Sequence, residues 1–380
     1  MSELSYLEKL LDGVEVEWRN LGDTSLFEIA NNGRKPVKAS LRIAGETPYY
    51  GANNIQDYVD GYTHDGEYVL IAEDGSASLE NYSIQYATGK FWANNHVHVV
   101  RGKERVHSRF LYHYLCIVNF LPFLTGGGRA KLTKGQLIEI PVPIPCPDNP
   151  EKSLAIQSEI VRILDKFTAL TAELTAELNM RKKQYNYYRD QLLSFKEGEV
   201  EWKTLGEVAQ FKRGTAITQK QTTPGEIPVV ANGPIPTYFH SESNRQGETI
   251  VIARSGAYAG YVSFWDQPIF LTDAFSVHSD LKIVKPKFIY HVLQNKQEHI
   301  HAMKKGAGVP HVRVKEFETY DIPIPPITEQ DRIVSILDKF DTLTNSITEG
   351  LPREIELRQK QYEYYRDLLF SFPKPETVSK

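Results

Sequence analysis

The chain contains an internal duplication. The segment IVRILDKF at 160–167 recurs as IVSILDKF at 333–340, and QYNYYRDQLLSF at 184–195 recurs as QYEYYRDLLFSF at 361–372. Fainter echoes link VEWRNLG from Val16 with VEWKTLG from Val200, and RFLYHYL from Arg109 with KFIYHVL from Lys287. Because the repeat unit is about half of the chain, the sequence predicts a duplicated architecture rather than a solenoid of short repeats.

The order of the repeated parts is circularly permuted. SYLEKLLDGVEVEW at 5–18 resembles YYRDQLLSFKEGEVEW at 187–202, so the chain opens with the tail of a repeat and ends with a helical repeat. We therefore expect residues 1–14 to form a tail that packs with the C-terminal helical repeat. The two ends would then meet, and the molecule would close with internal pseudo-two-fold symmetry.

The segments 149–199 and 326–380 carry the pattern of a coiled coil. From Ile160, mostly apolar residues recur in alternating steps of four and three over about five heptads. A helix from Ser153 to Phe195 would be on the order of 65 Å long at ~1.5 Å per residue. The two seams are expected to pack against each other antiparallel, although a purely structural coiled coil is an equally simple interpretation. The seam positions of the first copy are Ile160, Leu164, Phe167, Thr171, Leu174, Leu178, Arg181, Tyr185, Tyr188, Leu192 and Phe195.

The two helical segments differ in length. The second copy has four extra residues between its matched blocks, which is a stutter in the heptad pattern. The insertion falls near Gly350, Leu351 and Pro352, where a helix is expected to break or restart. The first copy instead holds a tandem TAEL-TAEL repeat at Thr171–Leu178, a unit of about one helical turn.

The remaining segments, 15–148 and 200–325, alternate short β-rich runs with turns and one helix each. Strands are expected at 68–72, 97–100, 249–253 and 261–264, and a packed helix within 110–124. Both segments end in proline-rich strings, IPVPIPCPDNP from Ile140 and IPIPPITEQ from Ile322, which we interpret as extended hinges. Ser153 and Thr328 are candidate caps of the helices that follow.

The composition is that of a soluble globular protein with few cysteines. Cys116 and Cys146 are its two cysteines and cannot form a disulfide framework, which fits a reducing cytosol and predicts a cytoplasmic location. The formal net charge of −4 argues against a stand-alone nucleic-acid binder. Residues 206–326, however, hold 13 basic and 11 acidic side chains, so DNA contact would rely on local basic loops or on a partner.

Polar loops with glycine, lysine, arginine and asparagine recur in both mixed segments. Arginine and lysine pair with guanine edges and phosphates, and asparagine pairs with adenine edges, so these loops are candidate DNA-binding sites. The alternative is that they are ordinary solvated basic loops. The candidates in the first segment are Arg34, Lys35, Lys38, Tyr50, Asn53, Arg129, Lys131 and Lys134. Those in the second segment are Lys212, Arg213, Lys220, Asn232, Arg254, Lys304, Lys305, His311 and Arg313.

The QYxYYRDxL ends of the helical repeats suggest a protein-binding patch. Tyr187 and Arg189 in the first copy, and Tyr364 and Arg366 in the second, combine residue types that are enriched at protein interfaces. The alternative is that the tyrosines cap a core and that each arginine pairs with the aspartate that follows it.

Motifs of catalysis are absent from the sequence. There is no dinucleotide or phosphate-binding glycine motif, no HExxH and no N/D-P-P-aromatic motif of an amino-methyltransferase, so no catalytic residue is predicted. The pairs His96/His98 and His299/His301 lack cysteine or carboxylate support, so no metal site is predicted.

These features together resemble one family. ILDKF at 163–167 and 336–340, QYxYYRDxL at 184–192 and 361–369, the VEWxxLG segments, and the SGAYAGYV and GAGVPHVRVKEFETYDIPIPP strings resemble the DNA specificity subunit of type I restriction–modification systems. The resemblance implies an α+β protein with two globular α/β target-recognition domains, 15–148 and 200–325, joined by two long antiparallel coiled-coil helices at 149–199 and 326–380.

The resemblance also implies function. Each recognition domain would read one half of a bipartite, asymmetric site in double-stranded DNA, and the helices would set the spacing and dock two methyltransferase subunits. Two restriction subunits would join this core. The chain itself would be non-catalytic, because S-adenosylmethionine, ATP and Mg would be used by the partner subunits. The alternatives are a stand-alone DNA-binding regulator and a coiled-coil scaffold for protein interactions.

Overall fold

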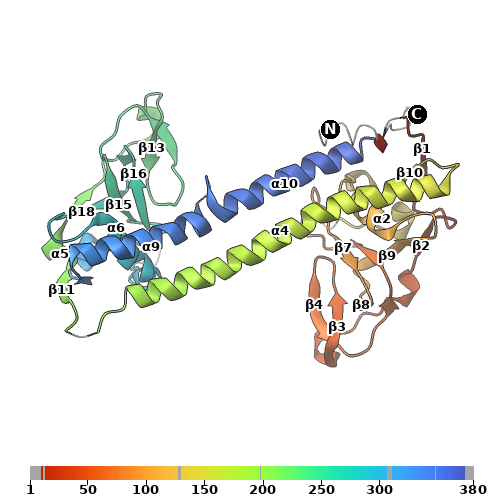
Figure 1. The fold of residues 1–380 in the computed structure, drawn as a ribbon, viewed down its shortest axis with the longest axis horizontal. Coiled ribbons are helices and arrows are strands. Elements are labelled where there is room, and N and C mark those ends of the chain that lie inside the picture. Colours follow the sequence, from red (N-terminus) through yellow and green to blue (C-terminus); the bar gives the residue numbers. More distant parts are fainter. Residues whose placement is uncertain are drawn as a thin grey trace. The chain divides into compact units, whose positions relative to one another are not determined.

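The computed structural model describes residues 10–11, 13–126, 130–196, 198–305, 310–346 and 348–372. The chain divides into two compact units (Figure 1). Unit 1 comprises Met1–Glu173 and Ile355–Lys380, and unit 2 comprises Leu174–Glu354. Each unit therefore holds one globular domain together with parts of both helical segments.

Unit 1 contains two four-stranded sheets. The first sheet is antiparallel and has the order β2-β9-β6-β7, and the second sheet has the order β4-β3-β8-β5. Helix α2 (Ser108–Leu115) contributes Phe110 and Leu111 to the core that the first sheet forms. The strands are β2 (Phe27–Ile29), β3 (Ala44–Tyr50), β4 (Ile55–Val59), β5 (His64–Asp65), β6 (Tyr68–Ala72), β7 (Ile84–Ala87), β8 (Lys90–Ala93) and β9 (Val97–Gly102).

Unit 2 repeats this arrangement. Its antiparallel sheet has the order β12-β18-β15-β16, strand for strand the order of the first sheet in unit 1, and a second sheet has the order β14-β13-β17. Helices α6 (Pro286–Asn295) and α7 (Gln297–Ala302) follow the sheet. The strands are β12 (Ala209–Arg213), β13 (Ile227–Val230), β14 (Tyr238–His240), β15 (Glu248–Ala253), β16 (Val262–Asp266), β17 (Phe270–Leu271) and β18 (Ala274–Ser279). All four predicted strands are confirmed, as β6, β9, β15 and β16.

The proline-rich strings are strands rather than free hinges. β10 (Pro141–Pro145) pairs with β1 (Val16–Asn20), and β19 (Asp321–Ile324) pairs with β11 (Glu201–Thr204). In β10 the prolines occupy alternate positions, where the missing amide would face away from the partner strand. Each VEW segment thus forms a two-stranded ribbon with the segment at the far end of its own domain, so the chain enters and leaves each domain at one place.

The helical segments form where the heptads predict them. Helix α4 spans Pro150–Leu192, and the second copy is split into α9 (Ile327–Asn345) and α10 (Gly350–Leu369). The predicted break is confirmed: Gly350 has a φ of 75°, a conformation that a residue with a Cβ rarely adopts. The predicted caps are wrong. The side chain of Asn149 accepts from the amide of Lys152, and α9 begins directly after Pro326.

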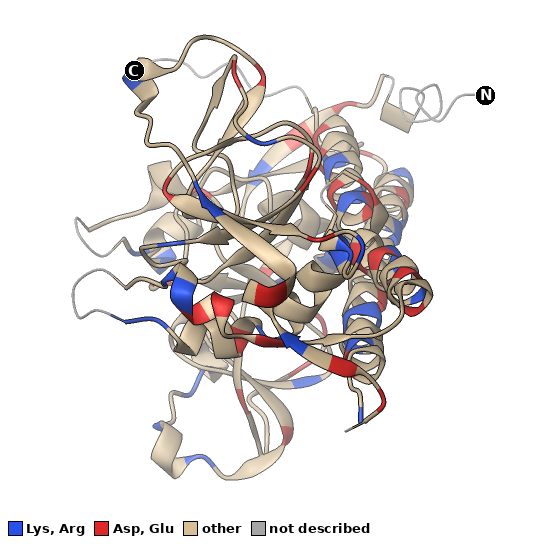
Figure 2. Cartoon of the chain, turned by 90° about the vertical axis from the view of Figure 1, so that its left-hand side faces the viewer, with Lys and Arg blue, Asp and Glu red and all other residues tan. Residues whose placement is uncertain are grey.

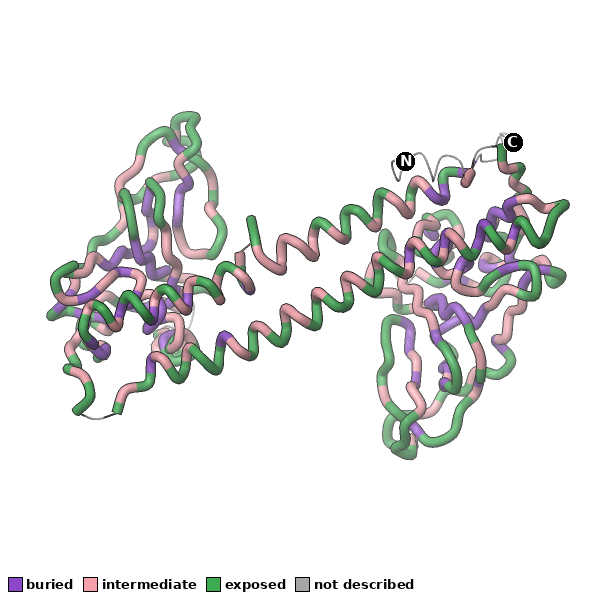
Figure 3. Tube along the Cα trace, viewed as in Figure 1, coloured by how far each residue is buried: buried purple, intermediate pink, exposed green. Residues whose placement is uncertain are grey.

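Within each unit, α4 packs against the second helical copy. In unit 1 the rings of Phe167 and Tyr365 stack at 5.2 Å, and in unit 2 Tyr185 stacks on Phe340 at 6.0 Å. The tube in Figure 3 shows exposed and partly buried positions alternating along the helices. Of the predicted seam, Tyr188 is 46% exposed and Phe195 lies beyond the end of α4.

Short helices complete the two units. They are η1 (Asn31–Gly33), η2 (Ala39–Leu41), η3 (Leu121–Phe123), α3 (Lys134–Leu137), α5 (Leu205–Val208), η4 (Gln219–Gln221) and α8 (Val314–Glu318). In the described part of the chain, no helix combines the length and the apolar character that a membrane crossing would need.

Candidate nucleic-acid interface

Unit 2 brings four of the predicted DNA-binding residues into one pocket. Arg213 ends β12, Arg254 follows β15, and His311 and Arg313 precede α8. These four residues and Lys315 line a cavity of about 590 Å³. Three segments far apart in the sequence therefore converge on one basic pocket, as a site for a phosphate or a base edge requires.

A carboxylate beside this pocket pairs with one of its arginines, Arg254. Asp273, the residue before β18, forms an ion pair with Arg254 Nη2 at 2.9 Å and accepts hydrogen bonds from Ser255 Oγ at 2.8 Å and from Asn232 Nδ2 at 2.5 Å. The Oδ1 atom of Asn232 is buried and has no hydrogen-bond partner among the described residues. Asp273 therefore fixes the direction in which Arg254 and Asn232 present their polar groups.

The neighbouring lysines brace the loops around the pocket. Lys304 donates to the carbonyl of Ala257 at 2.9 Å, and Lys305 pairs with Glu316 at 2.6 Å. Burial alone would raise the pKa of the Glu316 carboxyl, but the hydrogen bond from Lys305 and the amide of Arg313 lower it below its usual range. The ion pair therefore stays formed at neutral pH.

One residue that the sequence analysis missed supports Arg213. Arg245 donates through Nε to Ser276 Oγ at 2.7 Å and through Nη2 to the Arg213 carbonyl at 2.8 Å. Burial lowers the pKa of this guanidinium, which nevertheless stays protonated. Lys212 is exposed on β12, and Lys220 is exposed on η4 without lining the basic pocket.

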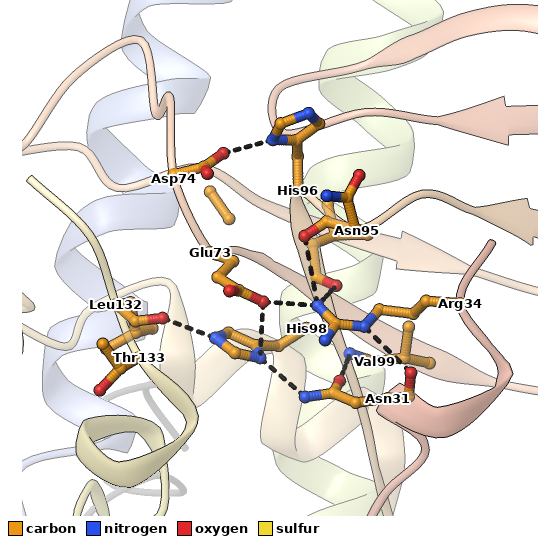
Figure 4. A network of polar contacts seen from close by, with 12 residues as sticks. Asn31, Arg34, Glu73, Asp74, Asn95, His96, His98, Val99, Leu132 and Thr133 are labelled. Carbon is orange, nitrogen blue, oxygen red and sulfur yellow. Dashed lines mark hydrogen bonds and ion pairs between the residues drawn. The ribbon is translucent and has the colours of Figure 1, made fainter. Parts of the chain in front are cut away.

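Unit 1 holds a different network at the equivalent edge of its sheet (Figure 4). Glu73, the residue after β6, pairs with Arg34 Nη1 at 2.5 Å and with Lys131 Nζ at 3.0 Å. Burial acts to raise the pKa of the Glu73 carboxyl, but the hydrogen bonds from Arg34 and Lys131 outweigh it, so the pKa is lowered. Two predicted DNA-binding residues thus share one carboxylate.

A buried histidine lies beneath this carboxylate. His98 Nε2 donates to the Leu132 carbonyl at 2.7 Å, and its Nδ1 accepts from Asn31 Nδ2 at 2.9 Å and lies 3.8 Å from Glu73 (Figure 4). Burial lowers the pKa of His98, which keeps the ring neutral at pH 7. His96 pairs instead with Asp74 at 2.5 Å. No metal-binding group of three or more histidine, cysteine or acidic residues occurs in the described ranges.

The other candidates of unit 1 do not converge on Glu73. Lys35 lies 5.9 Å from the Trp92 ring, and Tyr50 packs edge-on against Phe91. Asn53 donates to the Gly75 carbonyl at 2.8 Å and so ties two loops together. Lys38 and Lys134 are exposed, whereas Arg129 lies outside the described residues. Arg42 was missed by the sequence analysis; its guanidinium lies 4.1 Å from the Tyr49 ring and 3.3 Å from Asp57.

The tyrosine and arginine patches fit partly with a protein-binding surface and partly with a structural role. Tyr187 is 61% exposed and Tyr364 is 54% exposed, so both rings are available to a partner. Arg189 pairs with Asp190 at 3.3 Å and Arg366 pairs with Asp367 at 2.9 Å, as the structural alternative predicts. In Figure 2, lysines and arginines along the helices are interspersed with acidic residues.

Comparison with known proteins identifies the family. The chain matches the type I restriction modification DNA specificity domain over residues 14–181 and again over 197–357, and it belongs to that family. It is 49% identical to a type I restriction enzyme specificity subunit of Haemophilus influenzae, with 97% of this chain and 98% of the relative aligned. It is 43% identical to the EcoR124I/EcoR124II specificity subunit of Escherichia coli over the full length of both chains.

A solved structure has the same fold. The S subunit of a type I restriction–modification system from M. genitalium aligns over 96% of this chain and 98% of its own, with a TM-score of 0.73 at 18% identity. The family match and the two relatives confirm the resemblance inferred from the sequence: the chain is a type I DNA specificity subunit.

Proposed function

We propose that each globular domain reads one half of a bipartite, asymmetric site in double-stranded DNA. The observation that carries the proposal is the equivalence of the two polar clusters. They lie at the ends of matching strands in sheets of the same strand order, yet they hold different groups. Arg254 and Asp273 in unit 2 occupy the places of Glu73 and His96 in unit 1. One scaffold with unlike hydrogen-bonding groups suits two unlike half-sites.

The helical segments serve as the spacer in this proposal. α4 and the α9–α10 segment would form an antiparallel coiled coil, in a closed arrangement with pseudo-two-fold symmetry. The stacked pairs Phe167–Tyr365 and Tyr185–Phe340 within the units support it. The length of α4, 43 residues or on the order of 65 Å, would then set the distance between the half-sites.

Partner subunits would supply the chemistry and much of the positive charge. Two methyltransferase subunits would dock on the helical repeats, with the patches at Tyr187 and Arg189 and at Tyr364 and Arg366 as contacts, and two restriction subunits would join them. S-adenosylmethionine, ATP and Mg would act in those subunits. The net charge of −4 supports this division, because a chain that clamps DNA alone is usually basic. Such a complex would work in the cytoplasm.

Co-expression with a methyltransferase subunit encoded beside this chain tests the proposal. We expect a complex with two methyltransferase subunits per chain, and single-molecule sequencing should find methyladenine in a split motif. Tight sequence-specific binding by the isolated chain, with no partner and no methylation, would instead indicate a stand-alone regulator. Partner binding that does not depend on DNA sequence at all would indicate a scaffold.

A further inference from the structure

Two polar contacts attach the domain of unit 1 to helix α4. The side chain of Gln157 accepts from the amide of His107 at 2.9 Å and donates to the carbonyl of Arg105 at 3.1 Å, at the start of α2. Six residues after His107, in α2, His113 Nε2 bonds Asp165 Oδ1 at 2.7 Å. Gln157 and His113 are both fully buried, whereas the Asp165 carboxylate is 39% exposed.

Unit 2 contains the same two contacts. Gln330 on α9 accepts from the amide of Lys285 at 2.9 Å and donates to the carbonyl of Ile283 at 3.0 Å, at the start of α6. His291 Nε2 bonds Asp338 Oδ1 at 2.7 Å. Gln330 and His291 are again fully buried. We call the pair of contacts in each unit its domain clamp.

The two clamps match while the polar loops of the domains differ. In each helix the glutamine and the aspartate are eight residues apart, and in each domain helix the capped amide and the histidine are six apart. Apolar packing is non-directional and tolerates small rotations, whereas a hydrogen bond is directional and loses strength when its angle changes. Two such contacts on one pair of helices therefore fix the angle between them, which the surrounding leucines and phenylalanines would not do alone.

We propose that the residues of the domain clamps are positioning residues that fix the angle of each recognition domain on its helix. This angle determines how strictly the complex requires one gap length between the half-sites. The proposal rests on the proposed function, since it presupposes a split site. The base contacts come from the polar loops and are independent of the clamps. Loosening both clamps should therefore relax the gap length and leave the two half-site sequences unchanged.

The test uses the chain assembled with its methyltransferase subunits. The half-sites found for the unaltered complex are placed in duplexes with the native gap or with one base pair more or fewer, and methyl transfer to each is measured. In the double variant Asp165→Ala, Asp338→Ala, methylation at the altered gaps relative to the native gap should rise about tenfold. The removed carboxylates are 39% and 38% exposed and alanine favours a helix, so α4 and α9 should persist.

Two further variants separate positioning from a general loss of stability. Lys166→Ala with Lys339→Ala changes exposed neighbours on the same helices and should leave the gap strict. The double variant His113→Gln, His291→Gln keeps both aspartates and retains an N–H group that can donate to each of them. It should therefore keep most of the preference for the native gap that the aspartate variant loses.

Three results would overturn the inference. The gap could stay strict in an active aspartate variant, or it could relax equally in the lysine variant. As a third result, the two single variants Asp165→Ala and Asp338→Ala could both be insoluble, which would mean that the clamps serve folding alone. If the unaltered complex methylates no split motif, the proposed function fails instead, so the two failures are distinguishable.

Discussion

At the scale of single residues, an acidic side chain beside the basic pocket pairs with one of its arginines, Arg254. Asp273 pairs with Arg254 and accepts a hydrogen bond from Asn232. Because a negative charge repels phosphate, we expect this carboxylate to oppose the binding of unrelated DNA. We predict that Asp273→Ala weakens binding of the assembled complex to its own site by about 1–3 kcal/mol. Binding to unrelated duplexes should stay equal or become tighter.

Fluorescence anisotropy with specific and unrelated duplexes at several salt concentrations checks this prediction. Asp266→Ala, which removes an exposed carboxylate at the end of β16, is the matched control and should change neither affinity. An equal loss on both duplexes would mean that Asp273 merely stabilises the domain.

The buried His98 makes the stability of unit 1 depend on pH. Burial lowers the pKa of His98, and its contacts with the Leu132 carbonyl and Glu73 offset this only in part. The unfolded chain therefore binds a proton at a higher pH than the folded chain. The free energy of unfolding should fall as the pH drops below about 6.5, until the pH passes below the folded pKa.

The variant His98→Gln should show a smaller loss of stability between pH 7.5 and pH 5.5 than the unaltered chain. Denaturant unfolding at both pH values measures the difference. His96→Gln, which replaces the half-exposed neighbour that pairs with Asp74, is the control. A slope that His98→Gln leaves unchanged would assign the pH dependence to other groups.

Charge patterns predict the cations of the recognition loops but not the anions that direct them. Arg213, Arg254 and Arg313 were predicted because basic residues in glycine-rich loops suit DNA, and they do share one pocket. Asp273 and Glu73 were missed, since an isolated acidic residue has no sequence signature of its own. Their role depends on which loops the fold brings within about 3 Å of them.

At the scale of elements, the tandem TAEL repeat lies within the continuous helix α4. Deleting Thr171–Leu174 removes about 6 Å of helix, nearly two base-pair steps of DNA. We predict that this deletion shortens the gap between the half-sites and leaves the bases read in each half unchanged. Adding one TAEL should lengthen the gap by the same amount. Methylome sequencing of both variants measures the gap, and a constant gap would refute the ruler hypothesis.

The break between α9 and α10 depends on one glycine. Gly350 has a φ of 75°, and a Cβ added there would lie 2.3 Å from the carbonyl oxygen of Thr342. Gly350→Ala is therefore expected to destabilise unit 2 by roughly 1–3 kcal/mol. Thermal unfolding should show a lower midpoint, by about 2–4 °C for each kcal/mol. Gly198→Ala, at a φ of 84° but with open space around the added atom, should cost less.

The elements themselves were largely predictable, and their pairing was not. The heptads and the Gly350–Pro352 signal gave the helices and their break, because both depend on local sequence. The prolines of 141–145 suggested a hinge, since proline disfavours the interior of a sheet. β10 nevertheless pairs with β1, more than a hundred residues earlier, because its prolines fall on alternate positions. Pairing over such a distance leaves no local signal.

At the scale of the whole molecule, the duplication shows which features the two domains share and in which features they differ. The antiparallel four-stranded sheets of the two units keep their strand order, and the domain clamps keep their residue types. The polar groups at the sheet edges do not: a carboxylate follows β6 in unit 1, whereas an arginine follows β15 in unit 2. The two domains of this chain therefore share one scaffold and differ in the polar groups at its edge.

This modularity predicts that the two polar clusters act independently. Glu73 and Asp273 belong to separate units, and neither shares a described partner with the other. The losses in specific binding free energy caused by Glu73→Gln and by Asp273→Ala should therefore add in the double variant, within about 0.5 kcal/mol.

Titrating the assembled complex and its three variants with the split duplex measures this additivity. Duplexes that carry only one intact half-site should respond to the variant in one unit and ignore the variant in the other. A coupling free energy well above 0.5 kcal/mol would mean that binding at one half-site changes the other, through the helices or a partner subunit. Each half-site could then no longer be treated as the property of a single domain.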